Sequence, residues 1–274
     1  MKKTDVADFL QATRGMESRL FPVDACAFGM FDEIQKQEGI AGNLFEVGVH
    51  HGKTAILLAR AAAQSEVVGV CDLFESQELN VDRSGQGSRE LFLANMQSHT
   101  TLPPERLAIF AKRSAALTMD ETTSHVRFFH IDGGNRPEDV FADLLTADRA
   151  LLPDGVVSVD GVFNPNCPGV GEGFYNFLAT HPGVFVPVFI GGNKVFFARP
   201  DAASRYEQHW AGDGSWSKFF EPGPFTFDTR DWLGRRVLTA IRTEWVDLDP
   251  LAAARAHLGP AKLTDRIWRA LRGQ

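Results

Sequence analysis

The sequence has few cysteines and lacks any long apolar run. Its three cysteines, Cys26, Cys71 and Cys167, do not have the paired spacing of a zinc site, which indicates free thiols in a reducing compartment. No stretch approaches the roughly 18 apolar residues that a membrane-spanning helix needs. An acid at position 5 precedes any apolar core of a signal peptide. These absences predict a cytoplasmic protein without a membrane span.

Basic charge is also scarce. The formal net charge is -7, which argues against a surface built for nucleic acid and favours a small-molecule partner. There is no internal repeat and no low-complexity tract. The chain has 274 residues, 44% of them hydrophobic, enough for one large domain or two small ones with a proper core.

One segment has the pattern of a strand, a tight turn and a helix. Residues 44–49 are apolar apart from Glu46, residues 50–53 form a glycine-bearing turn, and helical spacing begins at Thr54. Gly48 and Gly52 permit unusual backbone angles and a close approach of a ligand to the main chain. This segment predicts the first unit of a nucleotide-binding α/β fold.

The rest of the chain suggests three regions. Residues 1–40 have helical spacing and are expected to cap the fold or close over a substrate. Residues 41–200 form the ligand-binding domain, and residues 201–274 form an extension that carries all five tryptophans. A final amphipathic helix with Arg266, Arg269 and Arg272 is either a solvated face or a contact for phosphate or a partner.

Within residues 41–200 the pattern predicts an α/β fold. Expected strands are residues 44–49, 67–72, 107–111, 126–131, 156–160, 184–190 and 194–199, with a turn at 151–155. Helices are expected between the first five strands, and Gly191-Gly192-Asn193 predicts a hairpin between the last two. The prediction is a doubly wound, mostly parallel seven-stranded sheet with an antiparallel final hairpin.

Acids stand at the ends of three predicted strands. Asp72, Asp132 and Asp160 should meet at one edge of the sheet, because parallel strands end at the same edge. Asp72 can accept hydrogen bonds from ribose hydroxyls or can be a turn residue. Ser114 follows the third strand and is placed to contact a base ring, and the aperiodic loop 73–88 is long enough to be a lid.

These segments together resemble class I S-adenosylmethionine-dependent methyltransferases, which have a Rossmann-like fold. Within that class they are similar to the sugar and small-molecule O-methyltransferases related to the macrocin and cephalosporin-pathway enzymes. The resemblance covers about residues 40–200 and rests on Glu46 to Lys53, Asp72, His130 to Gly134, Leu151 to Gly155, Val159-Asp160 and Pro168 to Gly173.

A nicotinamide or nucleotide-sugar enzyme is the less favoured interpretation. Val49, His50 and His51 separate Gly48 from Gly52, so the closely spaced second glycine of G-x-G-x-x-G is missing. That glycine lets the backbone approach a pyrophosphate, a group that S-adenosylmethionine lacks.

The resemblance implies a role for specific residues. The implied cofactor-binding residues are Glu46, Gly48, His50, Gly52, Lys53, Asp72, Ser114 and Asp132. Asp132 and Asp160 match the positions of ligands for Mg²⁺, but Gly161 stands where relatives carry a further acid. A magnesium requirement therefore stays open.

The identity of the general base also stays open. Relatives often carry a histidine where this chain has Asn135, and asparagine cannot accept a proton at neutral pH. The alternatives are His130, Asp160, His50, His51, a metal, or an acceptor that is hardly deprotonated at all.

The expected function is methylation of a hydroxyl on a sugar or other small molecule, as in secondary-metabolite or glycan modification. The alternative is a degenerate methyltransferase fold that keeps the cofactor pocket without catalysis. Homo-oligomerisation is compatible with the sequence.

Overall fold

The computed structural model describes residues 1–122, 125–211, 215–220 and 225–242. The chain divides into two units, Met1–Glu221 with Phe227–Ala240, and Pro222–Thr226 with Ile241–Gln274. The helix expected to carry Arg266, Arg269 and Arg272 lies outside the described residues. No helix in the described ranges is long and apolar enough to cross a membrane.

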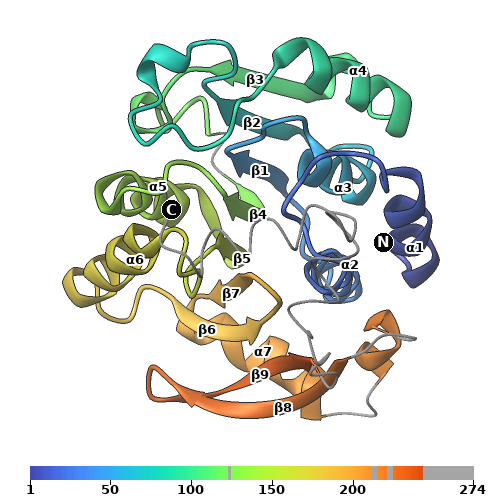
Figure 1. Cartoon of the computed structure of the whole chain (residues 1–274). Coiled ribbons are helices and arrows are strands. Elements are labelled where there is room, and N and C mark those ends of the chain that lie inside the picture. The colour runs from blue at the N-terminus through green and yellow to red at the C-terminus, as the bar shows by residue number, and fades with distance from the viewer. Residues whose placement is uncertain (123–124, 212–214, 221–224, 243–274) are drawn as a thin grey trace, which may run out of the picture. The chain divides into compact units, whose positions relative to one another are not determined.

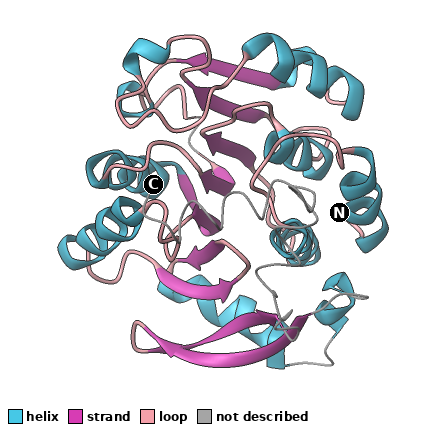
Figure 2. Ribbon diagram, viewed as in Figure 1, coloured by secondary structure: helices cyan, strands magenta, loops and turns pink. Residues whose placement is uncertain are grey.

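A mixed β-sheet organises the first unit (Figures 1 and 2). Its strand order is β3-β2-β1-β4-β5-β7-β6-β9-β8. The strands are β1 (Asn43–Val47), β2 (Val68–Asp72), β3 (Leu107–Ala111), β4 (Val126–Ile131), β5 (Leu151–Asp160), β6 (Val186–Ile190), β7 (Lys194–Ala198), β8 (Phe225–Trp232) and β9 (Arg235–Arg242). Strands β1 to β5 are parallel, and β7 is antiparallel to both β5 and β6.

The fold class predicted from the sequence is confirmed, but the predicted number of strands is wrong. The sheet has nine strands and not seven, because β9 pairs in parallel with β6 at Phe189 and Leu238 and β8 lies beyond it. β8 is rich in charged residues and only partly buried, so its sequence lacks the apolar run that marked the other strands.

The predicted turn at 151–155 is also wrong. These residues form the first half of β5, where Leu151 pairs with Val126. The pairing shifts register between Val126 and Phe128, which accommodates Pro153 and Gly155 within the longer strand.

Helices cover both faces of the sheet. α5 and α6 lie on one face, and α2 and α3 lie on the other (Figure 1). The α-helices are α1 (Lys3–Ala12), α2 (Pro22–Gln37), α3 (Lys53–Ala61), α4 (Arg89–His99), α5 (Pro137–Ala150), α6 (Pro168–Thr180) and α7 (Pro200–Ala211), and the short 3-10 helices are η1 (Gln77–Leu79), η2 (Pro104–Arg106), η3 (Ser114–Ala116) and η4 (Ser215–Phe220). The region predicted as helical at the N-terminus thus contains two helices.

Aromatic packing fixes α2 against the sheet. Phe28 stacks on Phe128 of β4 with 4.8 Å between ring centroids, and Phe31 stacks on Phe196 of β7 at 4.9 Å. Pro22 begins α2, where its fixed φ and missing N–H are tolerated. α2 therefore bridges the parallel strands and the antiparallel strands.

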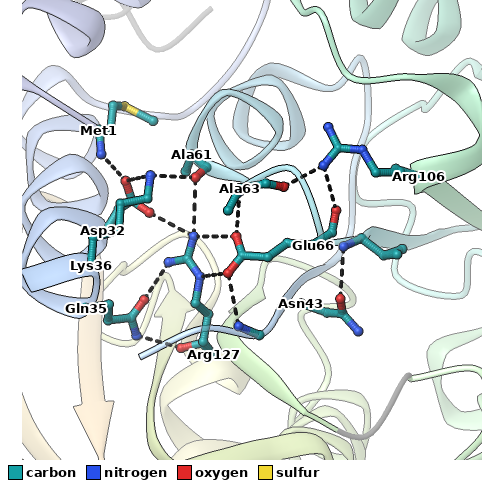
Figure 3. Close-up of polar contacts among 12 residues, drawn as sticks. Met1, Asp32, Gln35, Lys36, Asn43, Ala61, Ala63, Glu66, Arg106 and Arg127 are labelled. Carbon is teal, nitrogen blue, oxygen red and sulfur yellow. Dashed lines mark hydrogen bonds and ion pairs between the residues drawn. The ribbon is translucent and has the colours of Figure 1, made fainter. Parts of the chain in front are cut away.

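A fully buried arginine ties the start of β4 to two other elements (Figure 3). Arg127 is 0% exposed and pairs with both carboxylate oxygens of Glu66 at 2.7 and 2.9 Å. It also pairs with Asp32 of α2 at 2.8 Å and donates to Gln35 Oε1 at 2.7 Å. These bonds satisfy a buried guanidinium that otherwise carries a large desolvation penalty.

We expect Arg127→Met to lower the free energy of unfolding by about 3–5 kcal/mol, because it leaves the buried carboxylate of Glu66 without its cation and removes one of the cations paired with Asp32. Urea unfolding followed by circular dichroism measures the change. The matched control is Arg205→Met, which removes a half-exposed pair with Asp154 at 3.3 Å and should cost less than about 1 kcal/mol. Equal losses in the two variants would show that the Arg127 network does not stabilise the fold.

Candidate functional site

A cavity of about 460 Å³ opens at the carboxyl edge of the parallel strands. The chain order reverses between β1 and β4, and this switch point is where open α/β sheets bind ligands. Among the predicted site residues, those that line the cavity are Glu46, Gly48, His50, Lys53, Asp72, Ser114, Asp132, Asn135 and Asp160. Gly52 and His130 are not in its wall. The acids at the ends of β2, β4 and β5 do converge on one cavity, as the sequence predicted.

Asp72 holds the glycine turn after β1. Its Oδ2 accepts hydrogen bonds from the backbone N–H groups of Val49 at 2.6 Å and His50 at 2.8 Å. Its Oδ1 accepts from the N–H of Phe74 at 2.7 Å. The turn needs this support, because His50 has a φ of 53°, in the left-handed region that non-glycine residues rarely adopt. Asp72 therefore shapes the turn in addition to lining the cavity.

Gly48 lies where β1 and β4 approach each other at the cavity. Its φ is 80°, and a Cβ atom at this position would lie 1.8 Å from the carbonyl oxygen of Asp132. The N–H of Asp132 donates to the carbonyl of Val47 at 2.8 Å, which keeps the two strand ends together. Only glycine fits this backbone without displacing Asp132.

A buried pair of titratable groups lies behind the cavity. Glu46 Oε1 is 3.0 Å from His130 Nδ1, and both residues are at most 2% exposed. Burial raises the pKa of Glu46 well above its usual value, and burial lowers the pKa of His130 well below its usual value. Both shifts favour the neutral forms of the two groups. His130 Nε2 lies 4.0 Å from Asp132 Oδ2.

Lys194 lies between the two predicted metal ligands, and the sequence reasoning missed it. Its Nζ donates to Asp160 Oδ1 at 2.6 Å and to Asp132 Oδ2 at 3.2 Å. Burial by itself would lower the pKa of Lys194, but Asp132 and Asp160 raise it above its usual value. Burial and the charge of Asp160 raise the pKa of Asp132 to about 7, against the opposing effect of Lys194.

The turn before Lys194 is fixed by an acid from α2. Asp24, itself buried, accepts hydrogen bonds from the N–H groups of Gly192 at 2.8 Å and Asn193 at 3.1 Å. Asn193 Nδ2 in turn donates to both oxygens of Asp160 at 2.9 Å. A signal for these residues existed in the Gly191-Gly192-Asn193-Lys194 hairpin, but it indicated only a turn.

The loop predicted as a lid contributes to the cavity wall. Residues of this loop that line the cavity include Gln77, Leu79, Asn80, Val81, Asp82, Ser84 and Gly85. Asp82 Oδ2 accepts a hydrogen bond from the N–H of Asn135 at 2.5 Å, so the loop is attached to the segment after β4. Asn135 therefore contacts this loop through its main chain.

A second set of possible metal ligands involves both histidines of the turn. Ligand atoms of Glu17, His50 and His51 all lie within 4.8 Å of one another. The His50 and His51 rings are 3.7 Å apart, and burial together with the neighbouring His51 lowers the pKa of His50. Neutral imidazoles and a carboxylate are suitable ligands for a transition metal.

Comparisons with known proteins agree on the type of domain. Residues 45–162 match the family described as "Methyltransferase domain". None of the curated proteins matches the sequence.

Two solved structures are similar in fold. The O-methyltransferase NovP has a TM-score of 0.54 and 17% identity, over 65% of this chain and 81% of NovP. A protein from Corynebacterium glutamicum has a TM-score of 0.50 and 9% identity, over 72% of this chain and 89% of that chain. These similarities establish a Rossmann-like methyltransferase fold.

We expect Gly48→Ala to lower the free energy of unfolding by at least about 2 kcal/mol more than Gly39→Ala. Both glycines have positive φ, of 80° and 70°, but only Gly48 has a neighbour within 4 Å of the added Cβ. The difference therefore isolates the clash with Asp132 from the backbone strain. Urea unfolding of the two variants measures it, and equal losses would contradict the close approach of β1 and β4.

Proposed function

We propose that this chain is an S-adenosylmethionine-dependent methyltransferase that methylates a hydroxyl group of a small molecule or sugar. One observation carries the proposal: the match to the methyltransferase-domain family covers residues 45–162, and these include most of the wall of the 460 Å³ cavity. The finer assignment to oxygen acceptors rests on the sequence resemblance to O-methyltransferases and on the chemistry of the carboxylates at this edge.

The cavity suits S-adenosylmethionine in size and charge. Ligand pockets for molecules of this class span roughly 300–1,000 Å³. Asp72, Asp132 and Asp160 place carboxylates in the wall, which suits a positively charged sulfonium and amino group. Asp72 lies at the end of β2, where a carboxylate can accept hydrogen bonds from ribose hydroxyls. Ser114 lines the cavity at the end of β3, as expected for a contact to the adenine.

Bound S-adenosylmethionine supplies a methyl group made electrophilic by the positive sulfur. The protein has to hold the acceptor oxygen about 3–3.5 Å from that methyl carbon and remove the hydroxyl proton. Transfer of this methyl group to the acceptor oxygen would leave the electron pair of the broken carbon–sulfur bond on sulfur. The products are the methyl ether, S-adenosylhomocysteine and one proton.

Asp132 is the residue that we assign to receive the proton. Its side chain is 35% exposed and lines the cavity, whereas His130 is fully buried behind it. With a pKa raised to about 7, the carboxylate is a better proton acceptor than an ordinary aspartate. Asn135 stands where the resemblance predicts a histidine base, and its side chain cannot take up a proton. We assign it the role of attaching the loop through Asp82.

A second cavity of about 330 Å³ is the candidate acceptor site. Its wall includes the ring of Phe21, which is 48% exposed, and the ring of Phe163, which is 55% exposed. Asn164 and Asn166 add amide groups, and Lys194 belongs to the same wall. Exposed rings beside amides suit an acceptor with a flat or sugar-like face and several hydroxyls.

The alternative is a cofactor-binding protein without catalysis, favoured by Asn135 in place of a histidine base. Release of S-adenosylhomocysteine that depends on an added hydroxylated acceptor would exclude this alternative.

We expect wild-type protein to bind S-adenosylhomocysteine and Asp72→Ala to bind it at least about 10-fold more weakly. The substitution removes the proposed ribose contact, the two backbone hydrogen bonds that hold the turn and the one to Phe74, each worth about 1 kcal/mol. Isothermal titration calorimetry measures both dissociation constants. Asp154→Ala, which removes a half-exposed carboxylate, is the control and should bind like wild type. Absence of binding by the wild type would refute the proposed function.

We expect Asp132→Asn to reduce methyl transfer by about 10²–10⁴-fold, the usual contribution of a general base, while binding of S-adenosylhomocysteine stays within about 3-fold. Activity is measured as S-adenosylhomocysteine released over a panel of sugars and phenols. The control is Asp148→Asn. It changes a carboxylate of α5 that pairs with Arg199, and it should keep wild-type turnover. Unchanged turnover of Asp132→Asn would assign the proton to another group.

A further inference from the structure

The ammonium of Lys194 fills the space between the two carboxylates predicted to bind a metal. Nζ lies 2.6 Å from Asp160 Oδ1 and 3.2 Å from Asp132 Oδ2, and the lysine side chain is 0% exposed. Magnesium requires oxygen ligands at about 2.0–2.1 Å, so an ion bridging these two oxygens would need the volume that Nζ occupies. The donor set as folded fits an ammonium and does not fit a divalent cation.

Asp160 has little capacity left for a metal. Asn193 Nδ2 donates to both of its oxygens at 2.9 Å, in addition to the bond from Lys194. The carboxylate is only 10% exposed. It thus accepts three hydrogen bonds from β7 and the turn before it, and a metal would have to displace them.

The backbone also disfavours the missing acidic ligand. Gly161, which stands where relatives carry a further acid, has a φ of 76°, and a Cβ there would lie 3.0 Å from Cys167 Sγ. Its N–H donates to the carbonyl of Asn193 at 2.8 Å. The positive φ therefore favours glycine at this position, and its N–H attaches the segment after β5 to the turn before β7, next to Lys194.

The turn before Lys194 and the register of its strand hold this residue in place. Asp24 fixes the preceding turn through the N–H groups of Gly192 and Asn193. The register of β7 against β5 places Lys194 directly opposite Asp160. Lys194 also belongs to the wall of the second cavity, the candidate acceptor site. The ammonium donates to Asp132 and Asp160, so it binds both carboxylates at once.

We propose that Lys194 is the resident cation of the reaction centre and takes the place of a divalent metal, so that methyl transfer by this chain needs no metal ion. The proposal rests on the proposed function, because it assigns the cation of that same site. The ammonium orients Asp160 and Asp132 through these hydrogen bonds, and its positive charge beside Asp132 stabilises negative charge on the acceptor oxygen as its proton leaves.

The first test measures binding of Mn²⁺ to the wild-type protein by loss of the free-ion signal in electron paramagnetic resonance. The comparison is Asp160→Asn, because only binding that depends on Asp160 belongs to this site, whereas Glu17, His50 and His51 offer other ligands. We expect identical titrations for the two proteins. Tighter binding by the wild type than by Asp160→Asn would overturn the proposal.

The second test removes the ammonium. We expect Lys194→Ala to bind Mn²⁺ at least about 10-fold more tightly than wild type, because the space that Nζ occupies between Asp132 and Asp160 becomes available to an ion. Mn²⁺ should also raise the melting temperature of this variant and not that of wild type. The double variant Lys194→Ala/Asp160→Asn should lose both effects.

A matched control removes a different paired lysine from the wall of the first cavity. Lys112 pairs with Glu121 at 2.6 Å, and Lys112→Ala should gain no Asp160-dependent binding of Mn²⁺. A folded Lys194→Ala protein that gains none would overturn the proposal, because the lysine would then not be what excludes the ion. If Lys194→Ala does not fold, Lys194→Met replaces it, because methionine keeps most of the side-chain volume. The Mn²⁺ titrations of this variant and of wild type then test the proposal.

The proposed function is tested separately, by calorimetry with S-adenosylhomocysteine on the same wild-type sample. Failure to bind it refutes the methyltransferase assignment whatever the Mn²⁺ result. Binding of S-adenosylhomocysteine together with Asp160-dependent binding of Mn²⁺ by the wild type refutes only the role of Lys194. Binding of S-adenosylhomocysteine with no Asp160-dependent binding of Mn²⁺ until Lys194 is removed supports both.

Discussion

The buried ion pairs of Lys194 with Asp132 and Asp160 are the interaction on which the site depends. They join the end of the parallel part of the sheet to the first residue of antiparallel β7. Lys194 is fully buried and Asp160 is only 10% exposed, so their pairing offsets the cost of burying the two charges, whereas Asp132 is 35% exposed to the cavity. The ion pairs thus fix this end of the cavity.

The charge balance around Lys194 accounts for the neutral pair beside it. Glu46 and His130 are buried close to Asp132, and an extra negative charge at Glu46 would be repelled by that acid. The raised pKa of Glu46 and the lowered pKa of His130 both favour the neutral forms, which avoid that repulsion and a second buried cation next to Lys194. The strand β4 is thus held by charge at both ends, by Arg127 where it begins and by Asp132 just after it ends.

Much of the fold was predictable from local pattern. Apolar runs mark β1 to β7, and a turn or an acid follows each parallel strand, so the elements and the edge that gathers Asp72, Asp132 and Asp160 could be inferred. The strands β8 and β9 were not predictable in the same way, because β8 has no continuous apolar run and its place in the sheet depends on the pairing of β9 with β6. The long β5 was missed because a register shift against β4 admits Pro153.

The sequence by itself determined the α/β fold class, the glycine turn around Gly48 and the acids at the strand ends, since each depends on residues close together in the chain. Only the tertiary structure decided what neutralises those acids. Lys194 is 62 residues from Asp132 along the chain, and the antiparallel register of β7 and the hydrogen bonds of Asp24 bring it there. A contact between residues so far apart in the chain leaves no periodic pattern in the sequence. A buried charge needs an opposite charge nearby, but only the fold shows which residue supplies it.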